Sequence, residues 1–221
     1  MGSYEEVWES FSSEHRLEFG GYMDPGWRDA HALSACFMAP VDVSCFQERL
    51  EPLKEALRPL PYVSLHPDHF MHITLLLLGF LVQEPEDEGD ISREWLAEVE
   101  GSARRSLAGF PAFSVRLANL NAFPGAAFVE THDGGMLEKL RREVCQGCGL
   151  KTPSGPPHLT LAYFQAPDGT TAPEDLVSTI DRYRDWPIGE IQVDRVELTL
   201  LDLREEYPSP ETLAEIFLKT T

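Results

Sequence analysis

Basic residues, cysteines and long apolar runs are all scarce in this chain of 221 residues. Lys and Arg number 18 against 37 Asp and Glu, and the net charge is -19. A surface this acidic repels the phosphates of a long nucleic acid, because binding there depends on Lys and Arg. A cleft with its own donors can still bind one phosphate group locally. The charge therefore excludes a long nucleic acid as partner and favours a small nucleotide or a short oligonucleotide.

The scarcity of cysteines and of apolar runs excludes two further classes of protein. Four unevenly spaced cysteines are too few for a disulfide scaffold. The longest apolar run, residues 73–82, is far shorter than the roughly 20 residues that span a bilayer, and Thr74 interrupts it. The first residues carry neither the basic nor the apolar region of a secretory signal. We therefore expect a cytoplasmic monomer that has no contact with a membrane.

Two regions of different composition are visible along the chain. Residues 1–30 form an acidic extension, with seven Asp and Glu against two Arg. We expect a docked helix there, followed by a loop through Gly20, Gly21, Pro25 and Gly26. Residues 31–221 hold most of the apolar residues, and we expect them to form one domain of two pseudo-symmetric lobes.

The apolar spacing in residues 31–221 predicts alternating strands and helices. We expect strands over residues 32–38, 62–65, 71–80, 113–117, 126–130, 158–164 and 191–203. We expect helices over residues 45–57, 91–107, 136–147 and 173–183. Strand–helix–strand units occur in both halves, and each half has one strand that begins His-x-Thr. The sequence thus predicts a duplicated α+β fold.

Two segments combine an imidazole with a hydroxyl. They are Met71-His72-Ile73-Thr74 and Pro157-His158-Leu159-Thr160. Side chains two apart on a strand point to the same side, so each segment places its histidine beside its threonine, with the apolar residue turned to the core. A single His-x-Thr is common, but two copies at matching places in two similar halves indicate a shared site.

This set of side chains suits phosphodiester hydrolysis. One neutral histidine takes a proton from the attacking water, and the other, protonated, gives a proton to the leaving oxygen. Thr74 and Thr160 donate to the non-bridging oxygens of the phosphate. We therefore predict that His72 and His158 are catalytic. The similarity of the two strands leaves open which histidine is the acid.

The paired motifs resemble those of the two-histidine (2H) phosphoesterases, a family that includes the LigT-like RNA 2′,3′-cyclic phosphodiesterases, formerly called 2′-5′ RNA ligases. The Leu78-Gly79-Phe80 end of the first strand, the Asn121-Ala-Phe-Pro124 turn and the proline before His158 are also similar. The resemblance covers about residues 30–218 and implies a bilobal fold in which two antiparallel sheets flank a central cleft, with helices outside. It also implies no required metal or cofactor, and cyclic phosphodiesters or 2′-5′ linked oligonucleotides as substrates.

Three aromatic residues near the motifs are candidates for stacking on a base. They are Phe80, Tyr163 and Phe164. Strand alternation from His158 predicts that Phe164 shares the face of the histidine and that Tyr163 points to the other face.

Several alternatives stay open. His66, His69 and His72, with Asp68, would form a metal site if a turn at Pro67 brought the imidazoles together. The pair Cys145 and Cys148 is at most half of a zinc or redox site. Three other functions also stay open for this chain. It could be a catalytically silent nucleotide-binding module on the same fold, a 2′-5′ oligonucleotide phosphodiesterase or ligase, or an interaction protein that uses the acidic extension.

Overall fold

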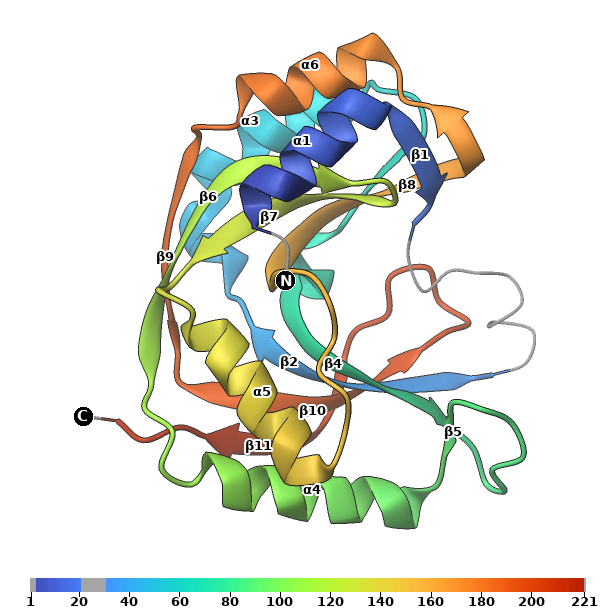
Figure 1. Ribbon diagram of the computed structural model, residues 1–221, viewed down its shortest axis with the longest axis vertical. Helices are drawn as coiled ribbons and strands as arrows, with labels where there is room; N and C mark the ends of the chain where they lie inside the picture. Colours follow the sequence, from blue (N-terminus) through green and yellow to red (C-terminus); the bar gives the residue numbers. More distant parts are fainter. Residues whose placement is uncertain (1–2, 21–30, 221) are drawn as a thin grey trace.

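A computed structural model describes residues 3–20 and 31–220 of the chain (Figure 1). The helices are α1 (Tyr4–Glu14), α3 (Gln47–Leu57), α4 (Arg93–Leu107), α5 (Met136–Cys148) and α6 (Glu174–Arg182), with the short 3-10 helices η1 (Val43–Phe46) and η2 (Asp68–Phe70). The strands are β1 (Arg16–Phe19), β2 (Leu33–Pro40), β3 (Val63–Leu65), β4 (His72–Leu81), β5 (Asp90–Ile91), β6 (Phe113–Phe123), β7 (Ala126–His132), β8 (His158–Thr171), β9 (Pro187–Val193), β10 (Arg195–Asp202) and β11 (Glu211–Phe217). Gly21, Pro25 and Gly26 of the predicted N-terminal loop lie outside the described residues.

The strands form one mainly antiparallel sheet, and its two halves meet at the two motif strands. The main strand order is β11-β10-β2-β4-β8-β7-β6-β9, and β1, β3 and β5 pair outside this path. The two halves are joined where Ile73 of β4 pairs with Leu159 of β8. One hydrophobic core runs through both halves and includes this pair. The predicted α+β class is therefore confirmed, whereas the two predicted antiparallel sheets are joined into one continuous sheet.

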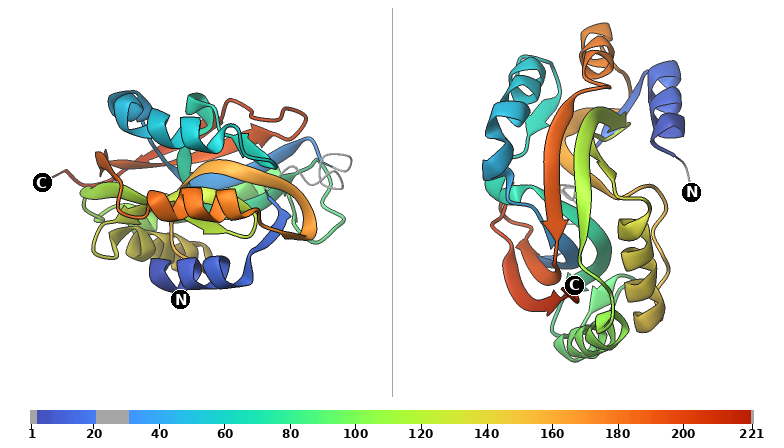
Figure 2. Two further views of the ribbon diagram at one scale, coloured as in Figure 1. Left: turned by 90° about the horizontal axis from the view of Figure 1, so that it is seen from above. Right: turned by 90° about the vertical axis from the view of Figure 1, so that its left-hand side faces the viewer.

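Helices cover both sides of the strands. In the right-hand view of Figure 2, α3 lies on one side, and α1 and α5 lie on the other. Helix α6 lies at one end of the molecule and α4 at the opposite end. The buried face of α5 contains Leu137, Leu140 and Val144, which is the apolar face that the sequence spacing predicts. None of the helices in residues 3–20 and 31–220 is long and apolar enough to cross a membrane.

The single strand predicted over residues 191–203 is wrong, because the chain passes from one half of the sheet to the other at Asp194. Strand β9 pairs with β6, whereas β10 pairs with β2. Strand β11 then pairs with β10 and was not predicted. Within β11 the buried residues are Ala214 and Ile216, which gives an apolar pattern too short to mark a strand.

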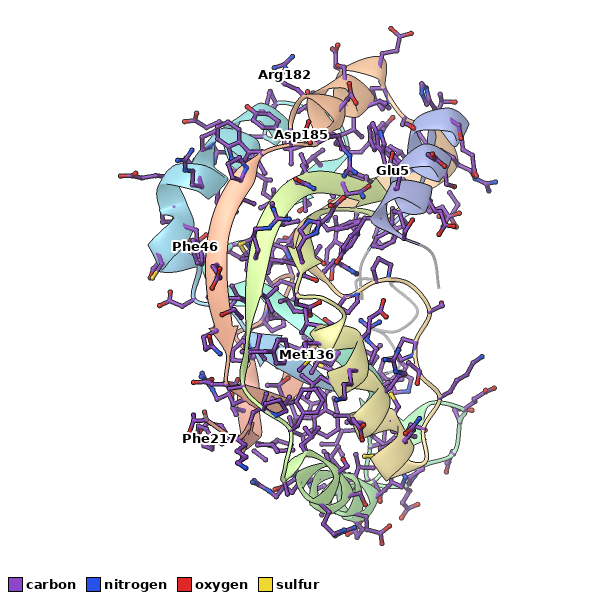
Figure 3. All side chains as sticks on the ribbon, turned by 60° about the vertical axis from the view of Figure 1, so that its left-hand side comes forward. Glu5, Phe46, Met136, Arg182, Asp185 and Phe217 are labelled. Carbon is purple, nitrogen blue, oxygen red and sulfur yellow. The ribbon has the colours of Figure 1, made fainter. Side chains whose placement is uncertain are left out.

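Two glycines allow close approaches between segments. Gly79 in β4 has a φ of 141°, and a Cβ there would lie 2.2 Å from the carbonyl oxygen of Gly89. At Gly189 in β9 a Cβ would lie 2.3 Å from the ring of Phe46, which Figure 3 shows at the start of α3 beside β9. A side chain at Gly79 would push β4 away from Gly89, and a side chain at Gly189 would push β9 away from Phe46.

Candidate active site

The four motif side chains share one face where β4 meets β8. Ile73 and Leu159 are fully buried, and they pair between the antiparallel strands. Because side chains alternate along a strand, the residues on both sides of this pair point away from the core. These partly exposed residues are His72, Thr74, His158 and Thr160. The register places each histidine beside the threonine of the other strand, so the structure brings the four predicted residues together.

Both histidines are held in the same way by the backbone. Nδ1 of His72 lies 2.7 Å from the carbonyl oxygen of Phe70, and Nδ1 of His158 lies 2.9 Å from that of Pro156. A carbonyl oxygen only accepts, so Nδ1 carries the hydrogen and donates it. Each neutral imidazole therefore keeps the lone pair of Nε2 for a ligand. The two halves repeat this contact with the residue two positions before the histidine.

Burial lowers the pKa of both histidines. The pKa of His72 falls to about 4, mainly through desolvation, and the bond to the Phe70 carbonyl opposes the fall. The pKa of His158 also falls to about 4 through desolvation, and the charges of Arg141 and His72 lower it further. Both imidazoles are therefore neutral at neutral pH in the free protein. A bound phosphate would favour the protonated form of either ring, because opposite charges attract.

Aromatic rings fix the orientation of both imidazoles. The ring of His158 lies 5.0 Å from that of Phe123 and 4.9 Å from that of Phe128. The ring of His72 lies edge-on to Phe70 at 5.4 Å. Phe123 and Phe128 themselves stack at 4.4 Å. These contacts and the Nδ1 bonds restrict rotation of the rings, which keeps the two Nε2 atoms in place.

The prediction that Phe164 contacts a substrate is wrong. Phe164 is fully buried and stacks on Phe11 of α1. The cause is an irregularity in β8, where Ala162 pairs with Ala127 but Thr160 already pairs with Phe128. The extra residue shifts the alternation by one position. Side chains after residue 161 therefore face opposite to the predicted direction.

The same shift places Tyr163 beside the second, smaller hydrophobic cluster, which consists of Cys36, Met38, Phe70, Leu201 and Leu203. Phe80 packs against this cluster as well. The ring of Tyr163 lies edge-on to His66 at 4.4 Å, and Phe80 stacks on His31 at 4.0 Å. Both aromatic residues are partly exposed, and base stacking by them stays a prediction.

A cavity of about 420 Å³ opens beside His72. Its lining includes Met38 of β2, Gln47 of α3 and Thr212 of β11. Acidic side chains also line it, which are Asp42, Asp68 and Glu197. A cavity with this lining suits the hydroxyl-bearing part of a substrate better than a second phosphate, because the carboxylates repel further negative charge.

Arg141 lies next to the site and was not among the residues predicted from the sequence. The arginine is buried on α5, and its Nη2 lies 3.3 Å from the carbonyl oxygen of Thr74. The sequence does carry a signal for this position. Residue 141 is four positions after Leu137 and three before Val144, so an arginine occupies the buried face of the helix.

The three histidines of the alternative metal site do not converge. His66 is buried and lies edge-on to aromatic rings, whereas Nε2 of His69 bonds the carbonyl oxygen of Tyr207 at 2.9 Å. Asp68 pairs with Lys54 instead. In the part of the chain that the structure describes, no three His, Cys, Asp or Glu side chains form a group that could hold a metal ion.

Cys145 and Cys148 lie on the last turns of α5, and burial raises the pKa of both thiols. The Cys148 thiol lies 3.5 Å from the carbonyl oxygen of Val99 in α4. These contacts fit a structural role at the junction of α4 and α5.

Comparison with known proteins yields one family and several similar structures. Residues 46–205 match the model of the 2′-5′ RNA ligase superfamily. The chain is similar to TT0787 of Thermus thermophilus, with 20% identity over 85% of this chain and 98% of that chain and a TM-score of 0.60. It is also similar to E. coli LigT complexed with 3′-AMP, with 16% identity, coverage of 86% and 99%, and a TM-score of 0.61. No curated protein sequence matches the chain.

Proposed function

This chain belongs to the 2′-5′ RNA ligase superfamily of two-histidine phosphoesterases, and we propose that it is a phosphodiesterase. Its substrate is a small cyclic phosphodiester, such as a nucleoside 2′,3′-cyclic phosphate or the same group at an RNA end. One observation carries the proposal. His72 and His158 lie on one face of adjoining strands, and each directs Nδ1 to a backbone carbonyl so that Nε2 is available.

The two imidazoles supply both proton transfers of the reaction. Nε2 of one neutral histidine accepts a proton from water while the water oxygen attacks phosphorus. The bond from phosphorus to one ribose oxygen breaks, and the other histidine donates its Nε2 proton to that oxygen. The products are a phosphomonoester and a free hydroxyl. Thr74 and Thr160 donate to the non-bridging oxygens, and no step requires a metal ion.

The charge of the chain and the similar structures support a small substrate. A net charge of -19 disfavours a long polyanion. E. coli LigT has been crystallised with 3′-AMP, with ATP and with NADP+. 3′-AMP is one of the two monophosphates that form when adenosine 2′,3′-cyclic phosphate opens.

The four free cysteines support a reducing compartment, so we place the enzyme in the cytoplasm.

The test is hydrolysis of the four nucleoside 2′,3′-cyclic monophosphates with EDTA present. The wild type is compared with His72→Ala, with His158→Ala and with the matched control His15→Asn. His15 ends α1 with a φ of 47°, a conformation that Asn tolerates. We expect turnover that survives EDTA, a loss of about 100-fold or more in each of the first two variants, and no change in the control.

Each other result points to a different function. Binding of the cyclic nucleotides by the folded wild type without turnover would favour the silent nucleotide-binding module. Cleavage or joining of 2′-5′ linked oligonucleotides alone would favour the oligonucleotide alternative. Activity abolished by EDTA would contradict the mechanism proposed here.

A further inference from the structure

The segment that precedes His158 lacks backbone donors of its own. Pro156 and Pro157 have no N–H groups, so neither residue can donate to a strand ladder. The carbonyl oxygen of Pro156 nevertheless sets the orientation of the imidazole, because it accepts the Nδ1 hydrogen of His158 at 2.9 Å. The position of this carbonyl therefore depends on whatever holds the residues on either side of it.

On the C-terminal side, Tyr4 of α1 holds the carbonyl of Pro157. The Tyr4 hydroxyl donates to that oxygen at 2.5 Å, and Oγ1 of Thr131 donates to it at 3.0 Å. The same hydroxyl accepts the backbone N–H of Thr131 at 3.0 Å. Burial raises the pKa of Tyr4 to about 12, so the hydroxyl keeps its hydrogen at neutral pH. The hydroxyl thus joins α1, β7 and the segment before β8.

The first turn of α1, which contains Tyr4, is anchored firmly enough for this role. Ser3 caps α1 in a capping box with Glu6, which fixes the first turn, and the backbone oxygen of Tyr4 accepts from Asn121 at 2.9 Å. Figure 1 shows α1 lying over the β6–β7 hairpin. Strand β1 then pairs with the far end of β8, and the fully buried Leu17 holds it there.

On the N-terminal side, Arg141 of α5 holds the carbonyl of Gly155. Its Nη1 donates to that oxygen at 2.9 Å, and its Nη2 donates to the carbonyl of Thr74 at 3.3 Å. The guanidinium therefore links the segment before the second motif to the strand of the first motif. Three successive carbonyls, of residues 155 to 157, each accept from a side chain.

We propose that Tyr4 and Arg141 are positioning residues that hold the Pro156 carbonyl, and through it the imidazole of His158. Helix α1, through Tyr4, then helps to orient the imidazole of His158. The effect on turnover rests on the proposed function, whereas the effect on the imidazole of His158 does not. The sequence carries no local sign of this role, because the Tyr4 hydroxyl contacts residues more than 120 positions away.

The test combines imidazole NMR with kinetics on Tyr4→Phe. We expect the signals of His158 to lose the pure Nδ1–H form and its pKa to rise by about 1 unit, because a looser segment admits water. The titration of His72 should not change. With a cyclic phosphate as substrate, and with each protein assayed at its own optimum pH so that the pKa shift does not enter, kcat should fall by about tenfold or more while KM stays within about twofold, because the imidazole is misplaced. Tyr183→Phe is the matched control, since Tyr183 also donates its hydroxyl to a proline carbonyl, that of Pro52.

Two further variants keep the test decisive if Tyr4→Phe does not fold. Thr131→Val removes the other donor to Pro157 but keeps the backbone N–H that Tyr4 accepts, and it should shift His158 in the same direction. Arg141→Met should raise the pKa of His158 by removing a nearby cation. An unchanged tautomer and pKa of His158 in folded Tyr4→Phe and Thr131→Val would overturn the inference. If the NMR changes occur but the wild type shows no turnover, the result supports the inference about His158 and refutes the proposed function.

Discussion

Acidification should accelerate the reaction at low substrate concentration. His72 and His158 each have a pKa of about 4 in the free protein, because burial disfavours the imidazolium. The proposed reaction requires one neutral and one protonated imidazole. Above about pH 5 the fraction with one proton falls about tenfold for each pH unit. We therefore expect kcat/KM to rise by about 100-fold between about pH 7 and about pH 5.

The assay is the initial rate of opening of a nucleoside 2′,3′-cyclic phosphate, followed from about pH 8 to about pH 5. A phosphodiester keeps a single negative charge over this range, so the pH profile reflects the protonation of groups in the protein. The profile of kcat should fall at higher pH than that of kcat/KM, because the bound phosphate stabilises the imidazolium. A kcat/KM that is flat or that rises with pH would refute the assignment of the two histidines as an acid–base pair with lowered pKa values.

Three further predictions follow from other contacts. Glu130→Gln should lower the melting temperature by roughly 10 °C in a thermal scan. The buried Glu130 carboxylate accepts from an arginine and two asparagines, and its loss costs about 3 kcal/mol. The control Glu98→Gln, at an exposed position, should change the melting temperature little. Thr74→Val and Thr160→Val should each lower kcat/KM by about tenfold to 100-fold with unchanged folding, because each removes one donor to the phosphate; equal activity would contradict their role. The pKa of buried His66 falls to about 3, mainly through desolvation, so below about pH 6.5 the unfolded chain binds a proton that the folded chain does not. Denaturant unfolding of the wild type should therefore lose about 1.4 kcal/mol more per pH unit on acidification than His66→Phe, and identical slopes would exclude this linkage.

The sequence predicts the elements that carry strong local patterns. Apolar spacing marks the faces of α5 and the central strand β4, and the two His-x-Thr segments begin strands as expected. The Pro124-Gly125 turn joins β6 to β7, where Phe123 pairs with Ala126. These features follow from period and turn chemistry alone, so a single sequence is enough to find them.

The errors have specific physical causes. An irregularity in β8 turns Phe164 into the core, and strand alternation cannot reveal an extra residue. The chain passes from one half of the sheet to the other at Asp194 without a glycine or proline to mark the change. Tyr4 and Arg141 act through contacts between distant segments. Only Arg141 could be recognised from the sequence, because it occupies the buried face of a helix.

The most direct test of the two-histidine mechanism is a double-mutant cycle on kcat/KM. It uses His72→Ala, His158→Ala and the double variant on one cyclic phosphate, with folding checked by circular dichroism. Residues that act as a unit are strongly non-additive. We expect each single variant to lose about 100-fold or more and the double variant to lose little beyond the worse single one. Losses that multiply, or one histidine that can be removed without loss, would contradict a shared acid–base mechanism.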